Sequence, residues 1–142
     1  MASLEICSQK KKRLQGNNRK HEYLRISPVE DCKMDIKEKL SLIRTLKTLL
    51  KKHLGNNIQE VILFGSQVNG TSHNYSDYDV LIVLNSDYDW KYRDKITDIV
   101  YDMELDYDIL IDKHLLSLNE IKYSLKGKEP IYKNAIKNGL YA

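Results

Sequence analysis

Two apolar runs, separated by a short polar segment that contains glycine, most restrict how this chain can fold. The first run extends from Ile58 to Phe64, and the second extends from Tyr78 to Leu84 and is almost uninterrupted in its apolar character. Both runs are typical of strands, and the second is suited to a strand that is buried on both faces rather than one with a solvent-exposed face. We therefore expect an α/β (α+β) fold, with a small mixed sheet and flanking helices.

The residues before and after these runs predict two helices. Between Ile36 and Leu54 the apolar residues recur at three- and four-residue spacing, and Gly55 follows as a C-terminal stop. That period is typical of an amphipathic helix. A second helix is expected to be capped by Asp87 or Ser86 and to end near Glu104.

The last third of the chain adds one strand and two shorter helices. We place the third strand at about Leu105 to Ile111, where apolar residues are again frequent. The sequence from Ser117 to Glu120 matches a capping box and should start a helix that ends near Gly127. Pro130 then suits the first turn of a final helix that Gly139 terminates.

Length and composition predict one folded domain with an extension. The chain has 142 residues, 42% of them hydrophobic, which is enough for a single core. Residues 1–33 are basic and lack an apolar period, so we interpret them as a poorly ordered extension of a domain that covers residues 34–142. No apolar run is long enough to cross a bilayer and no signal peptide of the usual order is present. We therefore expect a soluble, cytoplasmic protein.

The charge distribution raises the question of nucleic-acid binding. Residues 1–60 contain 14 lysines and arginines but only 7 acidic residues, whereas the remainder contains 9 and 13. A basic segment can contact phosphates, yet it is more often a solvated tail and helix face. Because no base-reading motif accompanies it, nucleic-acid binding is not expected.

The segment between the two apolar runs carries the residues best suited to chemistry. Gly65 and Ser66 follow the first strand, and a glycine with a hydroxyl beside backbone N–H groups suits anionic phosphate oxygens. Asp77 and Asp79 stand two residues apart at the entrance of the second strand, where they can share a hard divalent cation. Since two close carboxylates repel each other, a cation such as Mg²⁺ is the expected occupant.

A third carboxylate is expected on the neighbouring strand. Asp106, Asp108 and Asp112 are the candidates, and of these we favour Asp108 because it lies inside the expected apolar strand, where an unpaired carboxylate is hardest to tolerate. Asp108 could bind the cation or accept a proton from a substrate hydroxyl. The choice between Asp108 and Asp106 stays open at this point.

The motif resembles that of a known superfamily. A Gly65-Ser66 pair followed after ten residues by Asp77-x-Asp79 is similar to the signature of DNA polymerase β-like nucleotidyltransferases. The small size and short helical tail most resemble the minimal nucleotidyltransferase branch, over roughly residues 35–142. The resemblance implies triphosphate contact by Gly65 and Ser66, metal binding by Asp77 and Asp79, and a third acidic role for Asp108. One departure is Gln67, since many members carry arginine there.

The same resemblance implies a function. Proteins of this branch act as antitoxins that transfer AMP from ATP, with Mg²⁺, to a tyrosine of a HEPN (higher eukaryotes and prokaryotes nucleotide-binding) ribonuclease toxin. We therefore expect a protein adenylyltransferase whose metal ligands are Asp77, Asp79 and Asp108. The alternatives are transfer to a small molecule such as an aminoglycoside and a binding antitoxin that neutralises its partner without catalysis.

The expected domain boundary gives a first test. A chain that begins at Met34 should melt within about 2 °C of the full chain, because the preceding residues lack an apolar face with which to dock. Circular dichroism and a thermal melt of both chains measure this. A drop of many degrees would show that the extension packs on the domain.

Overall fold

The computed structural model describes residues 34–70 and 77–142. The predicted extension, residues 1–33, and the loop at 71–76 lie outside the described residues, so the boundary at Met34 stays a prediction. In chain order the principal elements are α3 (Ile36–Leu54), β1 (Ile58–Phe64), α4 (Ser66–Asn69), β2 (Tyr78–Leu84), α5 (Trp90–Tyr107), β3 (Ile111–Ser117), α6 (Leu118–Tyr123), α7 (Pro130–Asn138) and β4 (Leu140–Tyr141). The described residues also contain two short 3₁₀ turns, η2 (Gly55–Asn57) and η3 (Lys126–Lys128).

The four strands form one mixed sheet in the order β3-β2-β1-β4. Strand β1 is antiparallel to both β2 and β4, whereas β2 and β3 are parallel. A parallel pair needs a crossover, and α5 supplies it between the end of β2 and the start of β3. The predicted mixed α/β fold is confirmed, and the first two predicted strands have the expected bounds.

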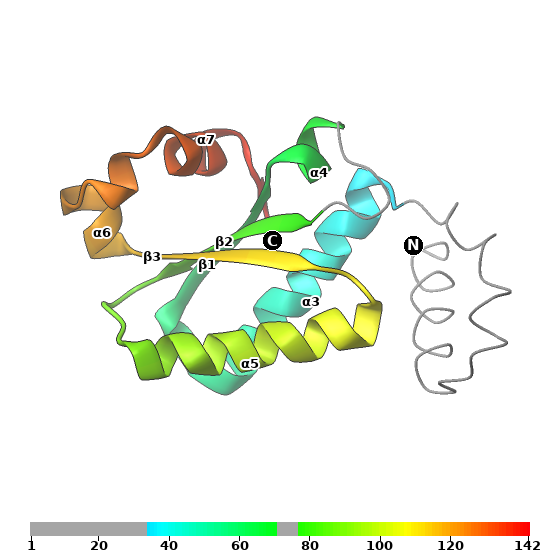
Figure 1. Ribbon diagram of the computed structural model, residues 1–142, viewed down its shortest axis with the longest axis horizontal. Coiled ribbons are helices and arrows are strands. Elements are labelled where there is room, and N and C mark those ends of the chain that lie inside the picture. The colour runs from blue at the N-terminus through cyan, green and yellow to red at the C-terminus, as the bar shows by residue number, and fades with distance from the viewer. Residues whose placement is uncertain (1–33, 71–76) are drawn as a thin grey trace, which may run out of the picture.

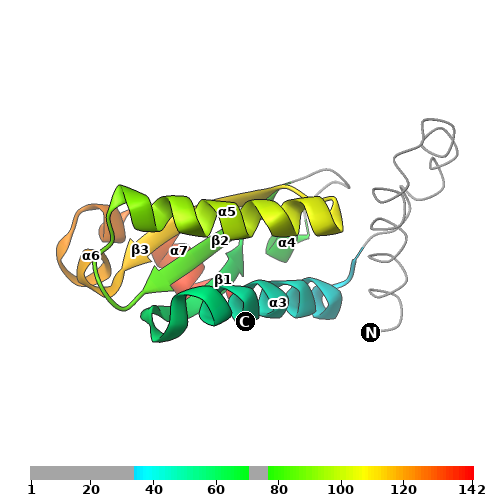
Figure 2. The ribbon, with the colours of Figure 1, turned by 90° about the horizontal axis from the view of Figure 1, so that it is seen from below.

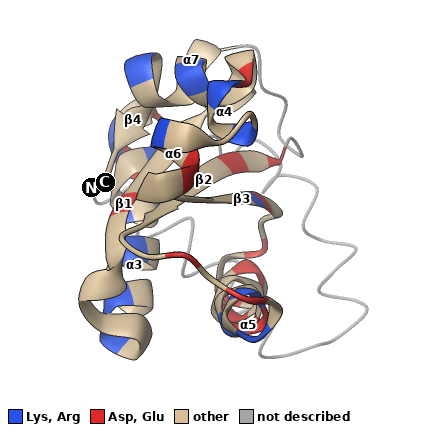
Figure 3. Ribbon diagram, turned by 90° about the vertical axis from the view of Figure 1, so that its left-hand side faces the viewer, with Lys and Arg blue, Asp and Glu red and all other residues tan. Residues whose placement is uncertain are grey.

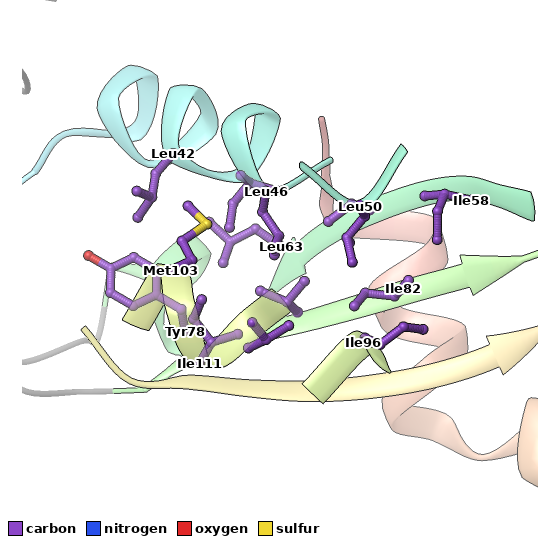
Figure 4. Close-up of a cluster of buried hydrophobic side chains, with 14 of the residues drawn as sticks. Leu42, Leu46, Leu50, Ile58, Leu63, Tyr78, Ile82, Ile96, Met103 and Ile111 are labelled. Atoms are coloured by element: carbon purple, nitrogen blue, oxygen red, sulfur yellow. The ribbon is translucent and has the colours of Figure 1, made fainter. Parts of the chain in front are cut away.

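Helices cover both faces of the sheet (Figure 1). Helices α3 and α5 run along one face, and Figure 2, seen from below, shows the two helices with the strands behind and between them. Their buried residues and the facing strand residues form the larger core, which Figure 4 shows around Leu46, Leu63, Ile82 and Met103. A smaller apolar cluster lies on the other face, under α6 and α7, and includes Leu81 and Leu116. The central strand β2 is therefore covered on both sides, as its apolar sequence predicts.

Local signals explain most helix ends. Gly55 ends α3 at a positive φ of 69°, as predicted. Ser117 caps α6 by accepting a hydrogen bond of 3.0 Å from the backbone N–H of Glu120, which confirms the start of the capping box. Asp89 caps α5 by accepting from the Tyr92 backbone N–H at 2.9 Å, so the expected cap at Asp87 or Ser86 is wrong by a few residues.

The third strand lies further along the chain than predicted. Residues 105 to 107 continue α5, Asp108 ends it in a left-handed conformation with φ of 53°, and β3 begins only at Ile111. Leu105 and Leu110 are 49% and 60% exposed, so two leucines that favoured a strand there are not part of the core. The helix therefore continues three residues beyond its predicted end near Glu104, although its last buried residue is Met103.

Within the described residues, no helix is long and apolar enough to span a membrane.

The junction of α7 and β4 depends on one small residue. Gly139 follows α7, and a Cβ at this position would overlap the carbonyl oxygen of Ala135 and the side chain of Ile62. Ile62 belongs to β1, so this close approach lets the chain turn from α7 and pair as β4. Sequence pattern did not predict β4, because a strand of two residues shows no alternation.

We predict that Gly139→Ala lowers the free energy of unfolding by about 1–3 kcal/mol, because the added methyl group overpacks the junction. Chemical denaturation of the two proteins measures the change. Lys137→Ala, an exposed substitution on the same helix, should change it by less than about 0.5 kcal/mol. Equal effects of the two substitutions would contradict the tight packing at Gly139.

Candidate functional site

Strand pairing brings two carboxylates together at one edge of the sheet. Asp79 is the second residue of β2 and pairs with Phe64 of β1 on one side and with Asp112 of β3 on the other. Asp112 is likewise the second residue of its strand, and His114 follows two positions later on the same face. The parallel register of β2 and β3 therefore places Asp79, Asp112 and His114 beside one another.

These three side chains form a compact group of possible metal ligands. Each offers one ligand atom, a carboxylate oxygen or an imidazole nitrogen, and all of these atoms lie within 4.8 Å of one another. Asp112 is about half exposed, with 54% of its side-chain surface accessible, whereas His114 is only 20% exposed. The group is thus open to solvent at Asp112 and enclosed at His114.

The charges in this group are poorly compensated. The pKa of Asp79 is raised above its ordinary value, first by burial, then by the negative charge of Asp112, while His114 opposes the shift. A hydrogen bond with Asp112 and the charge of Asp77 raise the pKa further. Among the ion pairs of the described residues, none joins a lysine or arginine to these aspartates. A divalent cation would relieve the repulsion, and the donor set fits one.

Ring contacts fix the orientation of His114. Its ring lies 5.4 Å from the Phe64 ring and 5.7 Å from the Tyr132 ring, measured between centroids. Its Nδ1 lies 3.3 Å from the hydroxyl of Tyr132, which α7 contributes. Its Nε2 lies 3.4 Å from a carboxylate oxygen of Asp112. The imidazole therefore presents Nε2 to the carboxylates and Nδ1 to α7.

Gly65 allows Asp79 to occupy its position. The glycine has a positive φ of 79°, and a Cβ added to it would overlap the carboxylate of Asp79. Its missing side chain was expected to leave room for a phosphate. The structure gives a further reason, because the Asp79 carboxylate itself lies against the Gly65 backbone.

The other predicted motif residues lie around this edge. Ser66 is the first residue of the short helix α4, as expected from the glycine turn. Asp77 is exposed and immediately precedes β2. It is near enough to raise the pKa of Asp79, yet it does not belong to the group of ligand atoms within 4.8 Å. The expected pair of Asp77 and Asp79 is thus joined by Asp112 and His114 from β3.

Gln67, where the resemblance led us to look for arginine, is directed into the fold. Only 3% of its surface is exposed. Its backbone carbonyl accepts a hydrogen bond of 3.0 Å from the ammonium group of Lys39 on α3. Burial lowers the pKa of Lys39, and the charge of Asp35 partly offsets that shift. Lys39 therefore brings a positive charge to the α4 turn.

The structure does not bring Asp108 into the cluster. This residue was expected inside the third strand, but it is the exposed C-cap of α5, and Asp106 is exposed in the last turn of that helix. The reason is the later start of β3, since the strand must begin opposite Tyr78 to pair in register with β2. Asp112 occupies the position that sequence reasoning gave to Asp108.

A sequence signal for Asp112 and His114 was present but weak. Tyr78-Asp79 and Ile111-Asp112 both place an aspartate after the first apolar residue of a strand. The pair Leu115-Leu116 supplies the apolar end of β3, as Val83-Leu84 does in β2. His114 had no recognisable ligand spacing, because its neighbours in the cluster come together only through strand pairing.

Comparison with known proteins agrees with this geometry. The model of the nucleotidyltransferase domain family matches residues 42–140, which include every residue of the cluster and the Gly65-Ser66 turn. A search of curated proteins finds no significant match.

The raised pKa of Asp79 predicts that removing its charge stabilises the metal-free protein. Since the pKa of Asp79 is raised in the folded protein, the folded state binds more protons, and the ionised carboxylate destabilises the metal-free fold as pH rises through that pKa. Asp79→Asn should therefore raise the melting temperature at about pH 7 in the presence of a chelator, and raise it less at about pH 4. Thermal melts at the two pH values measure the difference.

A divalent cation should make the wild-type chain more stable than the Asp79→Asn variant, the opposite of the order expected with a chelator. At a concentration about 100 times the dissociation constant it should stabilise the wild-type chain by about 2.7 kcal/mol and the Asp79→Asn variant far less. Asp102→Asn, which alters an exposed residue of α5, serves as the control and should respond to the cation like the wild type. An equal response of the Asp79 variant would place the cation elsewhere.

Proposed function

The chain belongs to the nucleotidyltransferase domain family, and we propose that it transfers AMP from ATP to a hydroxyl group of a partner protein. The donor nucleotide, the acceptor and the dependence on Mg²⁺ are parts of this proposal. It rests mainly on one observation, the group formed by Asp79, Asp112 and His114 beside the Gly65-Ser66 turn. Carboxylates that converge in this way suit a divalent cation, and the adjoining turn suits phosphate oxygens.

The position of each residue suggests whether it would contact the cation or the triphosphate. Asp79, with Asp77 beside it and Asp112 opposite, would hold the cation, which when bound offsets charge on the triphosphate. Gly65 and Ser66 would contact the triphosphate, a role carried over from the family resemblance. Lys39 would add positive charge at the α4 turn, next to the acidic group, and Figure 3 shows further basic residues on α7. The surroundings suit an anionic substrate.

The transfer step needs a proton acceptor close to the open side of the group. The acceptor oxygen would form a bond to the α-phosphorus as the bond from that phosphorus to the bridging oxygen of the β-phosphate breaks, and pyrophosphate would leave. The hydroxyl proton would pass to the carboxylate of Asp112. Asp112 suits this role because it faces Asp79 and is 54% exposed, so that an incoming hydroxyl can reach it.

The size of the domain favours a protein as the acceptor. The described residues form one sheet with its covering helices, without a second domain that could enclose a small acceptor. A folded partner can instead present a tyrosine to an open site and gain the same advantage of orientation. The resemblance to minimal nucleotidyltransferases supplies the partner class, a HEPN-type toxin, which would make this chain an AMPylating antitoxin in the cytoplasm.

A second candidate is a binding antitoxin that neutralises its partner without catalysis. Gln67 favours it, because this residue replaces the arginine of many relatives and its side chain is buried instead of facing a phosphate. The cluster of Asp79, Asp112 and His114 favours the enzyme, since a binding module needs no converging ligands.

Substitution of the acidic residues tests the proposal. After incubation with a HEPN-type ribonuclease, ATP and Mg²⁺, intact-mass spectrometry should show an AMP-sized increase on the ribonuclease, and its activity should fall. Asp79→Asn and Asp112→Asn should each slow the transfer by at least about 100-fold, because they remove a cation ligand and the proton acceptor.

Asp108→Asn is the matched control. It changes the same chemical group at the C-cap of α5, outside the cluster. Asparagine tolerates the left-handed conformation of that residue. This variant should retain transfer within about threefold of the wild type. Loss of transfer in Asp108→Asn but not in Asp112→Asn would refute the assignment of Asp112. Neutralisation of the ribonuclease without any change in mass, by the wild type and all variants, would establish the binding antitoxin.

A further inference from the structure

We infer that His114 is a ligand of the cation through Nε2, which makes the centre a mixed nitrogen and oxygen site that favours Mn²⁺ over Mg²⁺. This inference deepens the proposed function, since it concerns the same acidic group. It goes beyond that function by assigning a ligand and a metal preference that the acidic residues alone would not give. A centre of carboxylates alone would suit Mg²⁺.

The distances fit one shared ion. The ligand atoms of Asp79, Asp112 and His114 all lie within 4.8 Å of one another. Two ligands on opposite sides of a small divalent cation are separated by about 4 Å, and adjacent ligands are closer. Small side-chain adjustments therefore suffice to bring all three atoms to one ion. The backbone already fixes the arrangement, because Asp79 and Asp112 are register partners.

The inner nitrogen of His114 has no hydrogen-bonding partner in the part of the chain that the structure describes. Nε2 is buried, and among the described residues no group makes a hydrogen bond with it, although a carboxylate oxygen of Asp112 lies 3.4 Å away. A buried polar atom of this kind normally makes a hydrogen bond, so the missing hydrogen bond calls for an explanation. A cation between Nε2 and the carboxylates would supply one.

The other ring nitrogen has the support that ligating histidines usually have. Nδ1 lies 3.3 Å from the hydroxyl of Tyr132, a residue that is 8% exposed. If Nδ1–H donates to this hydroxyl, Nε2 carries the lone pair that a metal needs. Phe64 and Tyr132 contact the ring itself and hold it toward the carboxylates. The ring is thus oriented before an ion arrives.

The chemical consequence is a change in metal preference. Mg²⁺ favours oxygen ligands and near-ideal octahedral geometry, whereas imidazole suits transition metals better. Mn²⁺ accepts both carboxylate and imidazole ligands, and it can take the place of Mg²⁺ beside phosphates. The competing arrangement is an ion pair in which a protonated His114 faces Asp112. That arrangement gives His114 no contact with the metal.

Electron paramagnetic resonance of bound Mn²⁺ distinguishes the two arrangements. The full chain is titrated with Mn²⁺ alone, and pulsed measurements detect nitrogen directly coordinated to the ion. We expect a nitrogen coupling in the wild type and its loss in His114→Gln. We also expect the Mn²⁺ dissociation constant to rise at least about tenfold in that variant, while the Mg²⁺ constant, measured by competition, changes less than about threefold.

Two further variants serve as controls. His53→Gln alters an exposed histidine in the last turn of α3 and should keep both the coupling and the affinity. Tyr132→Phe keeps His114 but removes the hydroxyl beside Nδ1, and it should weaken Mn²⁺ binding while keeping the nitrogen coupling. If His114→Gln fails to fold, His114→Asn, checked by circular dichroism, replaces it.

The outcomes separate this inference from the proposed function. No nitrogen coupling in the wild type, or a coupling that persists in His114→Gln, overturns the inference. Nucleotide transfer that requires Asp79 would then still support the enzyme, with His114 as a charge partner. In Asp79→Asn we expect weaker Mn²⁺ binding with the nitrogen coupling retained, because His114 and Asp112 remain. Loss of the coupling in His114→Gln, with the coupling kept in His53→Gln and Tyr132→Phe, supports the inference.

Discussion

The parallel pairing of β2 with β3 is the interaction on which the site depends. It sets Asp79 opposite Asp112 in register, and it places His114 one pleat further along the same face. Helix α5 makes this pairing possible because parallel neighbours need a long crossover. The apolar stripe of that helix, which includes Ile96 and Met103, holds it against the sheet. The larger core therefore determines where the carboxylates meet.

One face of the sheet carries the larger core, and the other carries the acidic group. The face under α3 and α5 carries the larger apolar cluster and supplies most of the buried surface. The face under α6 and α7 is apolar only along part of its length and becomes polar where Asp79 and Asp112 lie. Because α7 ends in β4, which pairs with β1, the helix that carries Tyr132 is anchored to the sheet. His114 is thereby supported from a distant part of the chain.

Sequence reasoning predicted the elements with strong local signals and missed what strand register decides. Helix α3, β1, β2 and the capping at Ser117 each have a pattern within a few residues, and the structure agrees with them. The segment around Leu105 contains apolar residues at both helical and strand spacing, so local pattern could not decide between them. Because of this ambiguity the third strand was predicted several residues too early, and Asp108 was chosen in place of Asp112. Asp79 and the Gly65 turn were predicted because the whole motif lies within one short stretch of sequence.

The contact between Gly65 and Asp79 limits how far residue 79 can reach. The glycine backbone lies directly against the aspartate carboxylate, with no side chain between them. A glutamate at position 79 would carry the same charge on a side chain one methylene longer. Its carboxylate would have to turn away from Gly65, and so away from the edge that it shares with Asp112. Aspartate and glutamate, commonly treated as equivalent, are therefore not interchangeable at this position. The space beside the Gly65 backbone fits the shorter aspartate side chain.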